Sequence, residues 1–110
     1  MIVGTPVEAS PWPCAPAEAL PEGVTAYRRT PDFTELTVPH GLLQAHSTKA
    51  GTWGLIHVLE GALTYRIVDE RRSGTERRLE PGAAPGVVEP EILHEVTPQG
   101  SVRFNVEFFR

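Results

Sequence analysis

Short apolar runs that alternate with turn residues are the feature that most constrains this chain. From Val24 onward, turn signals recur about every 8 to 12 residues, a spacing typical of all-β proteins. No segment carries apolar residues at i, i+3, i+4 and i+7 over the length that predicts a helix. The pattern predicts almost no helix and about nine strands, at residues 25–28, 33–38, 42–46, 55–59, 63–68, 77–79, 84–88, 91–97 and 102–109.

Two connections between these strands have distinctive sequences. Glu60 and Gly61 lie between two β-rich runs, which predicts a tight hairpin. Residues 69–78 (DERRSGTERR) are highly charged and include a glycine, which predicts a solvated hairpin loop without a function of its own. So many short strands must protect their edges, and a closed barrel or a double-sheet jelly roll does so economically. We expect a single-domain jelly roll.

The N-terminal segment differs from the rest of the chain. Five of the 11 prolines lie in the first 21 residues, where each fixes φ and removes a backbone donor. We interpret residues 1–21 as an extended arm and residues 22–110 as the folded domain. The arm is either a disordered tail or a segment that packs through Ile2 and Trp12 on its own domain or a partner.

Charge and composition exclude several classes of partner. The 14 acidic and 10 basic residues give a net charge of −4, which provides no attraction to phosphate backbones or anionic lipid. We therefore expect neither nucleic acid nor membrane as a partner. No apolar run approaches the roughly 20 residues of a spanning helix, and no signal peptide is visible. Cys14 is the single cysteine and has no disulfide partner within the chain, so we expect a cytoplasmic protein.

The four histidines occupy different contexts. His40 lies in a turn between Pro39 and Gly41, where a solvated role is expected. His46 ends the run GLLQAH, and His94 lies in VEPEILHEV after a proline-marked bend. Two histidines at the ends of well-separated strands meet only inside a rolled sheet. Each is therefore either a satisfied core residue or part of a shared site.

The order of these motifs resembles that of the cupin superfamily. The two motif blocks of that superfamily match five features of this chain in order. These are a glycine five residues before a histidine, a strand ending in VLEG, the segment LEPG, a proline-marked turn and a second histidine. Over residues 20–110 the chain resembles the small cupin family that includes the N-terminal domain of the tellurite-resistance protein TehB and the YeaR-like proteins. HxTKxGTWG together with VEPxxxHxV is the specific part of this resemblance. It implies a cupin barrel.

The resemblance also implies a metal site. It makes His46 the first histidine of motif 1 and His94 the histidine of motif 2, both pointing into the barrel. Cupin sites usually have three histidines and one glutamate. Here Thr48 stands at the second motif 1 histidine, and Gly54 stands near the position of the glutamate.

Other side chains are candidates to complete a site, because a usable metal site needs at least three converging protein donors. Glu91 and Glu89 lie close before His94 across the bend. Alternation along residues 102–109 places Glu107 on the face opposite Val106, which is either solvent or a polar lumen. His57 is either a satisfied histidine or a third imidazole. Such donors suit zinc, iron, nickel or manganese.

Two further residues are candidates for ligand binding. Lys49, the only lysine, lies between His46 and Trp53. Near a barrel mouth its ammonium group would bind an anion or, with a lowered pKa, act as an acid; the alternative is a lysine in water. Trp53 is either core or a pocket wall. His57 would line the same pocket if it faces inward.

These features lead to three functional hypotheses. The first is a small cupin that holds a divalent metal and binds an anionic small molecule or oxyanion, with a link to tellurite or related stress that rests on the resemblance. The second is a metal-free binding or sensor module that uses the same histidines. The third is a structural homodimer that exchanges its arm or a sheet edge. The 110 residues leave no room for a nucleotide-binding α/β domain. A homodimer is expected in any case, because a small barrel leaves apolar strand faces exposed.

Overall fold

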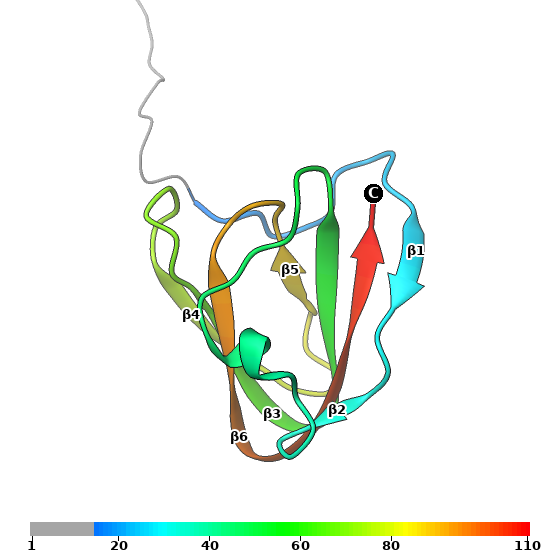
Figure 1. The fold of residues 1–110 in the computed structure, drawn as a ribbon, viewed down its shortest axis with the longest axis vertical. Coiled ribbons are helices and arrows are strands. Elements are labelled where there is room, and N and C mark those ends of the chain that lie inside the picture. Colours follow the sequence, from blue (N-terminus) through cyan, green and yellow to red (C-terminus); the bar gives the residue numbers. More distant parts are fainter. Residues whose placement is uncertain (1–14) are drawn as a thin grey trace, which may run out of the picture.

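A computed structural model describes residues 15–110, which form one antiparallel sheet (Figure 1). Its strands are β1 (Ala26–Arg29), β2 (Phe33–Thr34), β3 (Trp53–Ile67), β4 (Thr75–Leu79), β5 (Gly86–Val88) and β6 (His94–Phe109). Within residues 15–110, the single helical element is a 3₁₀ turn, η1 (His40–Leu43). The prediction of an all-β fold with almost no helix is confirmed for these residues. Most of the predicted N-terminal arm, including Cys14, lies outside the described residues.

The sheet curls but does not close. Its main order is β1-β6-β3-β4, while β2 pairs with β6 and β5 pairs with β3. The edge strands β1 and β4 are not hydrogen-bonded neighbours in this order, so the barrel implied by the resemblance is open. In the described part of the chain, no helix is long and apolar enough to cross a membrane.

Two long strands, β3 and β6, form the frame of the sheet. Residues 53–58 of β3 pair with residues 104–109 of β6, and residues 63–67 pair with residues 94–98. Between these two ladders the register shifts. Both strands bend there, and their halves rise on two sides of the molecule (Figure 1). Irregular pairing of this kind increases local bending and twist, which curls the sheet around its inner face.

The expected hairpin at Glu60 and Gly61 is wrong, because β3 runs through these residues without turning back. The two runs that flank them pair with β6 rather than with each other. Gly61 has φ +74°, and a Cβ built on it would lie 2.0 Å from the backbone oxygen of Ser101. This glycine therefore allows the close approach of β3 and β6 at the bend.

Other strand predictions are shortened or replaced. Residues 42–46 form the end of η1 and a loop instead of a strand. The run 33–38 ends as a strand after Thr34, where the Thr34 amide donates to Thr37 Oγ1 (2.8 Å) and starts a turn. The run 91–97 enters the sheet only at His94, because Glu91 adopts a left-handed conformation (φ 65°) in the preceding turn.

The core lies on the concave inner face of the curled sheet. Its fully buried side chains are Phe104, Leu63, Leu79 and Val88. Alternation along β6 sends Phe104, Val106 and Phe108 to this face, and Gly54 and Ile56 of β3 face the same side. The same apolar face continues into a cavity.

Candidate functional site

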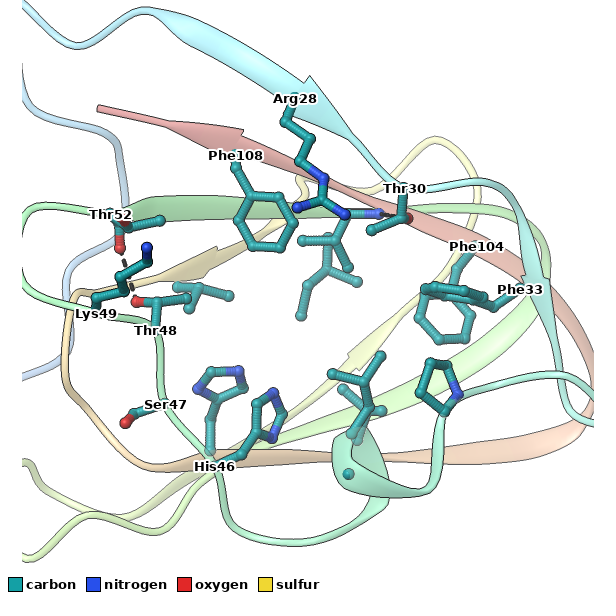
Figure 2. Close-up of a pocket in the computed structure, with 18 of the residues that line it drawn as sticks. Arg28, Thr30, Phe33, His46, Ser47, Thr48, Lys49, Thr52, Phe104 and Phe108 are labelled. Carbon is teal, nitrogen blue, oxygen red and sulfur yellow. Dashed lines mark hydrogen bonds between the residues drawn. The ribbon is translucent and has the colours of Figure 1, made fainter.

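A cavity of about 500 Å³ opens on the inner face of the sheet (Figure 2). Apolar side chains from β2, η1, β3, β5 and β6 form most of its wall. Polar side chains reach it from β1 and from the loop at residues 46–52. Its size and its mixture of apolar walls with few polar groups are typical of small-molecule sites.

His46 and His94 meet in this cavity. Their backbones exchange two hydrogen bonds, from His46 N to His94 O (3.0 Å) and from His94 N to His46 O (2.8 Å). Residues paired in this way place their side chains on the same face. The two ring centroids lie 4.2 Å apart, at an interplanar angle of 56°. The convergence of the two motif histidines follows directly from this bridge.

Each imidazole is held by its own segment. Nδ1 of His46 lies 3.0 Å from Gln44 O, and Nδ1 of His94 lies 3.0 Å from Ile92 O. A carbonyl oxygen only accepts, so Nδ1 carries the hydrogen in both rings. In a neutral imidazole, Nε2 is then left with a lone pair. Neither Nε2 has a hydrogen-bond partner within residues 15–110.

His94 is neutral at physiological pH. Its residue is 4% exposed, and Tyr65 packs edge-on against its ring, with the centroids 5.7 Å apart. This burial lowers the pKa of His94 to about 4. Its Nε2 is therefore a hydrogen-bond acceptor or a metal ligand, not a cationic group.

A buried aspartate fixes the turn before His94. Asp69 is 4% exposed and accepts hydrogen bonds from the Arg71 guanidinium and from the Leu93 amide (3.0 Å). Arg71 also donates to the carbonyl oxygen of Glu91. The hydrogen bonds from Arg71 hold the pKa of the Asp69 carboxyl well below its usual range. The predicted solvated loop at residues 69–78 therefore needs correction, because Asp69 is buried and β4 begins at Thr75.

Two cations of the cavity lack an anionic partner. Six of the arginines form ion pairs with carboxylates, namely Arg29, Arg66, Arg71, Arg72, Arg78 and Arg103. Arg77 donates to backbone carbonyls, and Arg110 lies over the Tyr27 ring. Among residues 15–110, no group pairs with the side chains of Arg28 and Lys49, and both residues line the cavity.

The cavity lining contains no acidic side chain among the described residues. The remaining lining residues with polar side-chain atoms are the two histidines, Tyr27, Thr30, Ser47, Thr48 and Thr52. Thr48 Oγ1 donates to Thr52 O (2.7 Å), which closes the loop that carries Lys49. The cavity is thus electropositive, although the chain as a whole is acidic.

Several predicted site residues lie outside this lining. Glu107 and His57 are on the outer face of the sheet, where His57 Nε2 lies 3.0 Å from Glu107 Oε1. Arg29 completes this cluster at 3.2 Å from the same oxygen. Burial alone raises the pKa of Glu107, but hydrogen bonds from His57 and Arg29 outweigh it and keep the pKa below its usual value. Trp53 alternates onto the same outer face.

The two carboxylates near His94 also point elsewhere. Glu89 is buried in a bidentate ion pair with Arg72, with distances of 2.9 and 3.0 Å. Glu91 is exposed, and its amide donates to Thr48 O (3.0 Å). The structure therefore brings together His46, His94 and the cavity-lining Lys49, but not the other candidate donors.

The donor set offers an incomplete metal site. Within residues 15–110, no group of three or more His, Cys, Asp or Glu side chains converges as a metal site would require. Two imidazoles fall short of the three protein ligands of a typical catalytic zinc site. The residues present therefore do not by themselves form a complete protein cage for a metal.

Arg28 is the charged cavity residue that sequence reasoning missed. Nothing in the sequence distinguishes it from the adjacent Arg29, because both lie in a short exposed strand at the sheet edge. A register shift between Ala26 and Arg28 breaks the simple alternation there. As a result, Tyr27 and Arg28 both line the cavity, and Arg29 points to the outer cluster.

Comparisons with known proteins agree with this fold. A probable S-adenosyl-L-methionine-dependent methyltransferase TehB of Haemophilus influenzae is 32% identical over 71 residues, which cover 64% of this chain and 25% of that protein. The match thus spans a quarter of the length of this curated relative. The crystal structure of TehB from Haemophilus influenzae superposes with a TM-score of 0.71 at 27% identity, covering 78% of this chain and 31% of that one.

A second solved structure matches over nearly its whole length. It is a protein from E. coli strain K12, with a TM-score of 0.73 and 26% identity, covering 84% of this chain and 95% of that one. The model of the TehB-like domain matches residues 28–106, which hold both motif histidines and all of β2 to β5. The chain belongs to the TehB-like domain family.

Proposed function

We propose that this chain is a metal-free binding module that holds an anionic small molecule in its inner cavity. The observation that carries the proposal is the pair of cations, Arg28 and Lys49, that lack partners among the described residues and line the same cavity. Every other arginine side chain has an anionic, carbonyl or aromatic partner. An unpaired cation at a partly enclosed site is well placed to bind an anion by charge-assisted hydrogen bonds.

The histidine pair supplies a second kind of contact. Because Nδ1–H of each ring donates to a backbone carbonyl, Nε2 faces the ligand as an acceptor in the neutral ring. A ligand that carries a hydroxyl or N–H group beside its anionic group would therefore bind both the two cations and the two Nε2 acceptors. The cations would bind the charge, and the imidazoles would accept from the donor.

The test is calorimetric titration of the wild-type protein with sodium acetate, octanoate, sulfate and tellurite. We expect at least one of these anions to bind, and we expect Lys49→Gln and Arg28→Gln each to weaken that binding about tenfold through loss of a charged hydrogen bond. Arg78→Gln is the matched control, because Arg78 pairs with Glu80 and is not a cavity residue. Binding unchanged in both cavity variants, or absent for all four anions, contradicts the proposal.

A metal function is the second candidate, and one observation favours it. Metal-binding histidines commonly donate their other ring nitrogen to a carbonyl oxygen, as His46 and His94 both do. A zinc, iron, nickel or manganese ion would take its remaining ligands from water or the bound anion. Elemental analysis of untagged protein decides between the candidates: stoichiometric metal that disappears in His46→Ala and His94→Ala would replace the metal-free proposal.

We propose that the module works in the cytoplasm and as a homodimer, with tellurite among the anions to test because of the motif resemblance. The half-buried Trp53, Leu55 and Phe109 on the outer face of β3 and β6 support a dimer contact. In the longer TehB relatives, a domain of this kind would provide ligand binding beside the methyltransferase part.

A further inference from the structure

Polar and apolar groups occupy different ends of the cavity. His46, Ser47, Thr48, Lys49 and Thr52 gather at one end, where they come from a single loop (Figure 2). Phe33 and Phe104 lie at the opposite end (Figure 2), with their ring centroids 5.7 Å apart and an interplanar angle of 64°. The cavity therefore has a polar head end and an aromatic tail end.

Apart from Arg28 and Thr30, much of the remaining cavity wall is apolar. Ile56, Val88, Val96, Val106 and Phe108 contribute to this apolar wall. An inorganic oxyanion has no apolar surface, so it would leave these side chains in contact with water. A cavity of about 500 Å³ also lies in the range of sites that enclose organic ligands. The shape and the lining thus favour a ligand that is partly apolar.

We infer that the ligand is an amphiphilic organic anion, with its charged head at residues 46–52 and its apolar tail directed toward Phe33 and Phe104. The inference rests on the proposed anion-binding function and names the class of ligand for that site. Lys49 binds the head at the loop end. Arg28 reaches the cavity beside Phe108 and Thr30 (Figure 2), where it contributes positive charge along the path from head to tail.

A series of straight-chain carboxylates from acetate to octanoate, measured by calorimetry below their micelle concentrations, tests the ligand class. We expect the affinity to rise about fourfold for each added CH₂ group, as apolar surface leaves water, until the tail fills the cavity. The matching primary alcohols should bind more weakly at every chain length, because they lack the charge. Sulfate and tellurite should bind more weakly than octanoate.

Variants test which end of the cavity binds the charged head and which end binds the apolar tail. Lys49→Gln should weaken all carboxylates by a similar factor and leave the dependence on chain length unchanged. Phe33→Ala should weaken octanoate and leave butyrate unchanged, and Phe33→Leu provides a milder change if the alanine variant folds poorly. Leu36→Ala is the control, because Leu36 is 87% exposed and lies outside the cavity.

The results of these titrations distinguish a failure of the proposed ligand class from a failure of the proposed anion-binding function. Equal affinity for acetate and octanoate, or tighter binding of tellurite, would overturn the amphiphilic class and leave anion binding intact. Alcohols that bind as tightly as carboxylates would overturn the role of the cations and retain the apolar cavity. If none of these compounds binds, both the inference and the proposed function fail.

Discussion

His94 belongs both to the cavity lining and to the buried interior of the fold. Its backbone pairs with His46, its ring packs on Tyr65, and its preceding turn is fixed by Asp69. The motif resemblance identified both histidines, and their convergence agrees with it. Asp69 was out of reach of sequence reasoning, because an aspartate at the start of a charged run gives no sign that it is buried.

The burial of His94 predicts a loss of stability in mild acid. Its pKa is about 4 in the folded state, against about 6.5 for an exposed histidine. The unfolded chain therefore binds a proton more readily, so the free energy of unfolding should be constant above pH 6.5 and decrease as the pH falls toward 4. The full decrease is about 3 kcal/mol, measured by urea unfolding across this range.

A variant isolates the contribution of His94. In His94→Gln the decrease between pH 6.5 and 4 should largely disappear, whereas in His40→Gln, an exposed histidine of η1, it should remain. Below pH 4 both variants should still lose stability, because the Asp69 carboxyl binds a proton in the unfolded chain, whereas Arg71 keeps its pKa well below the usual range in the folded protein. An unchanged acid profile in His94→Gln contradicts this account.

At the scale of elements, the sequence predicted where strands occur better than how they connect. The apolar runs on either side of Gly61 are correctly β, but a glycine with positive φ serves a hairpin and a bulge equally well. The pairing of Gly61 with Val102 of β6, which is distant in the sequence, decides between the two structures. Alternation likewise placed Glu107 opposite Val106 without telling which face is inner, and the structure puts Glu107 with His57 on the outer face.

The bend at Gly61 gives a prediction about stability. Gly61→Ala should lower the free energy of unfolding by about 2 to 4 kcal/mol, because the alanine must adopt positive φ and its Cβ would collide with the Ser101 backbone. Gly74→Ala is the matched control, since no atom lies within 4 Å of the added Cβ there. Urea unfolding midpoints provide the measurement. Equal effects of the two substitutions would show that the bend tolerates a side chain.

At the scale of the whole molecule, the curled open sheet brings two motifs that are far apart in the sequence to one cavity. The bent β3 and β6 bring the His46 loop, β1 and the inner face of β6 around a common space. The all-β class followed from the spacing of apolar runs and turns. The positive charge of the cavity could not be predicted from the sequence, because the overall composition is acidic. Only the fold brings the two unpaired cations to the same site. The homodimer stays a prediction.

The central claim is that an organic anion binds beside the histidine pair. Nitrogen-edited NMR spectra of the imidazole side chains during titration with octanoate test it most directly, because His57 on the outer face serves as an internal control. We predict saturable shifts of the His46 and His94 Nε2 resonances with the calorimetric Kd, and a constant His57 signal. Unperturbed His46 and His94 resonances at saturating octanoate, or equal shifts at His57, would contradict the account.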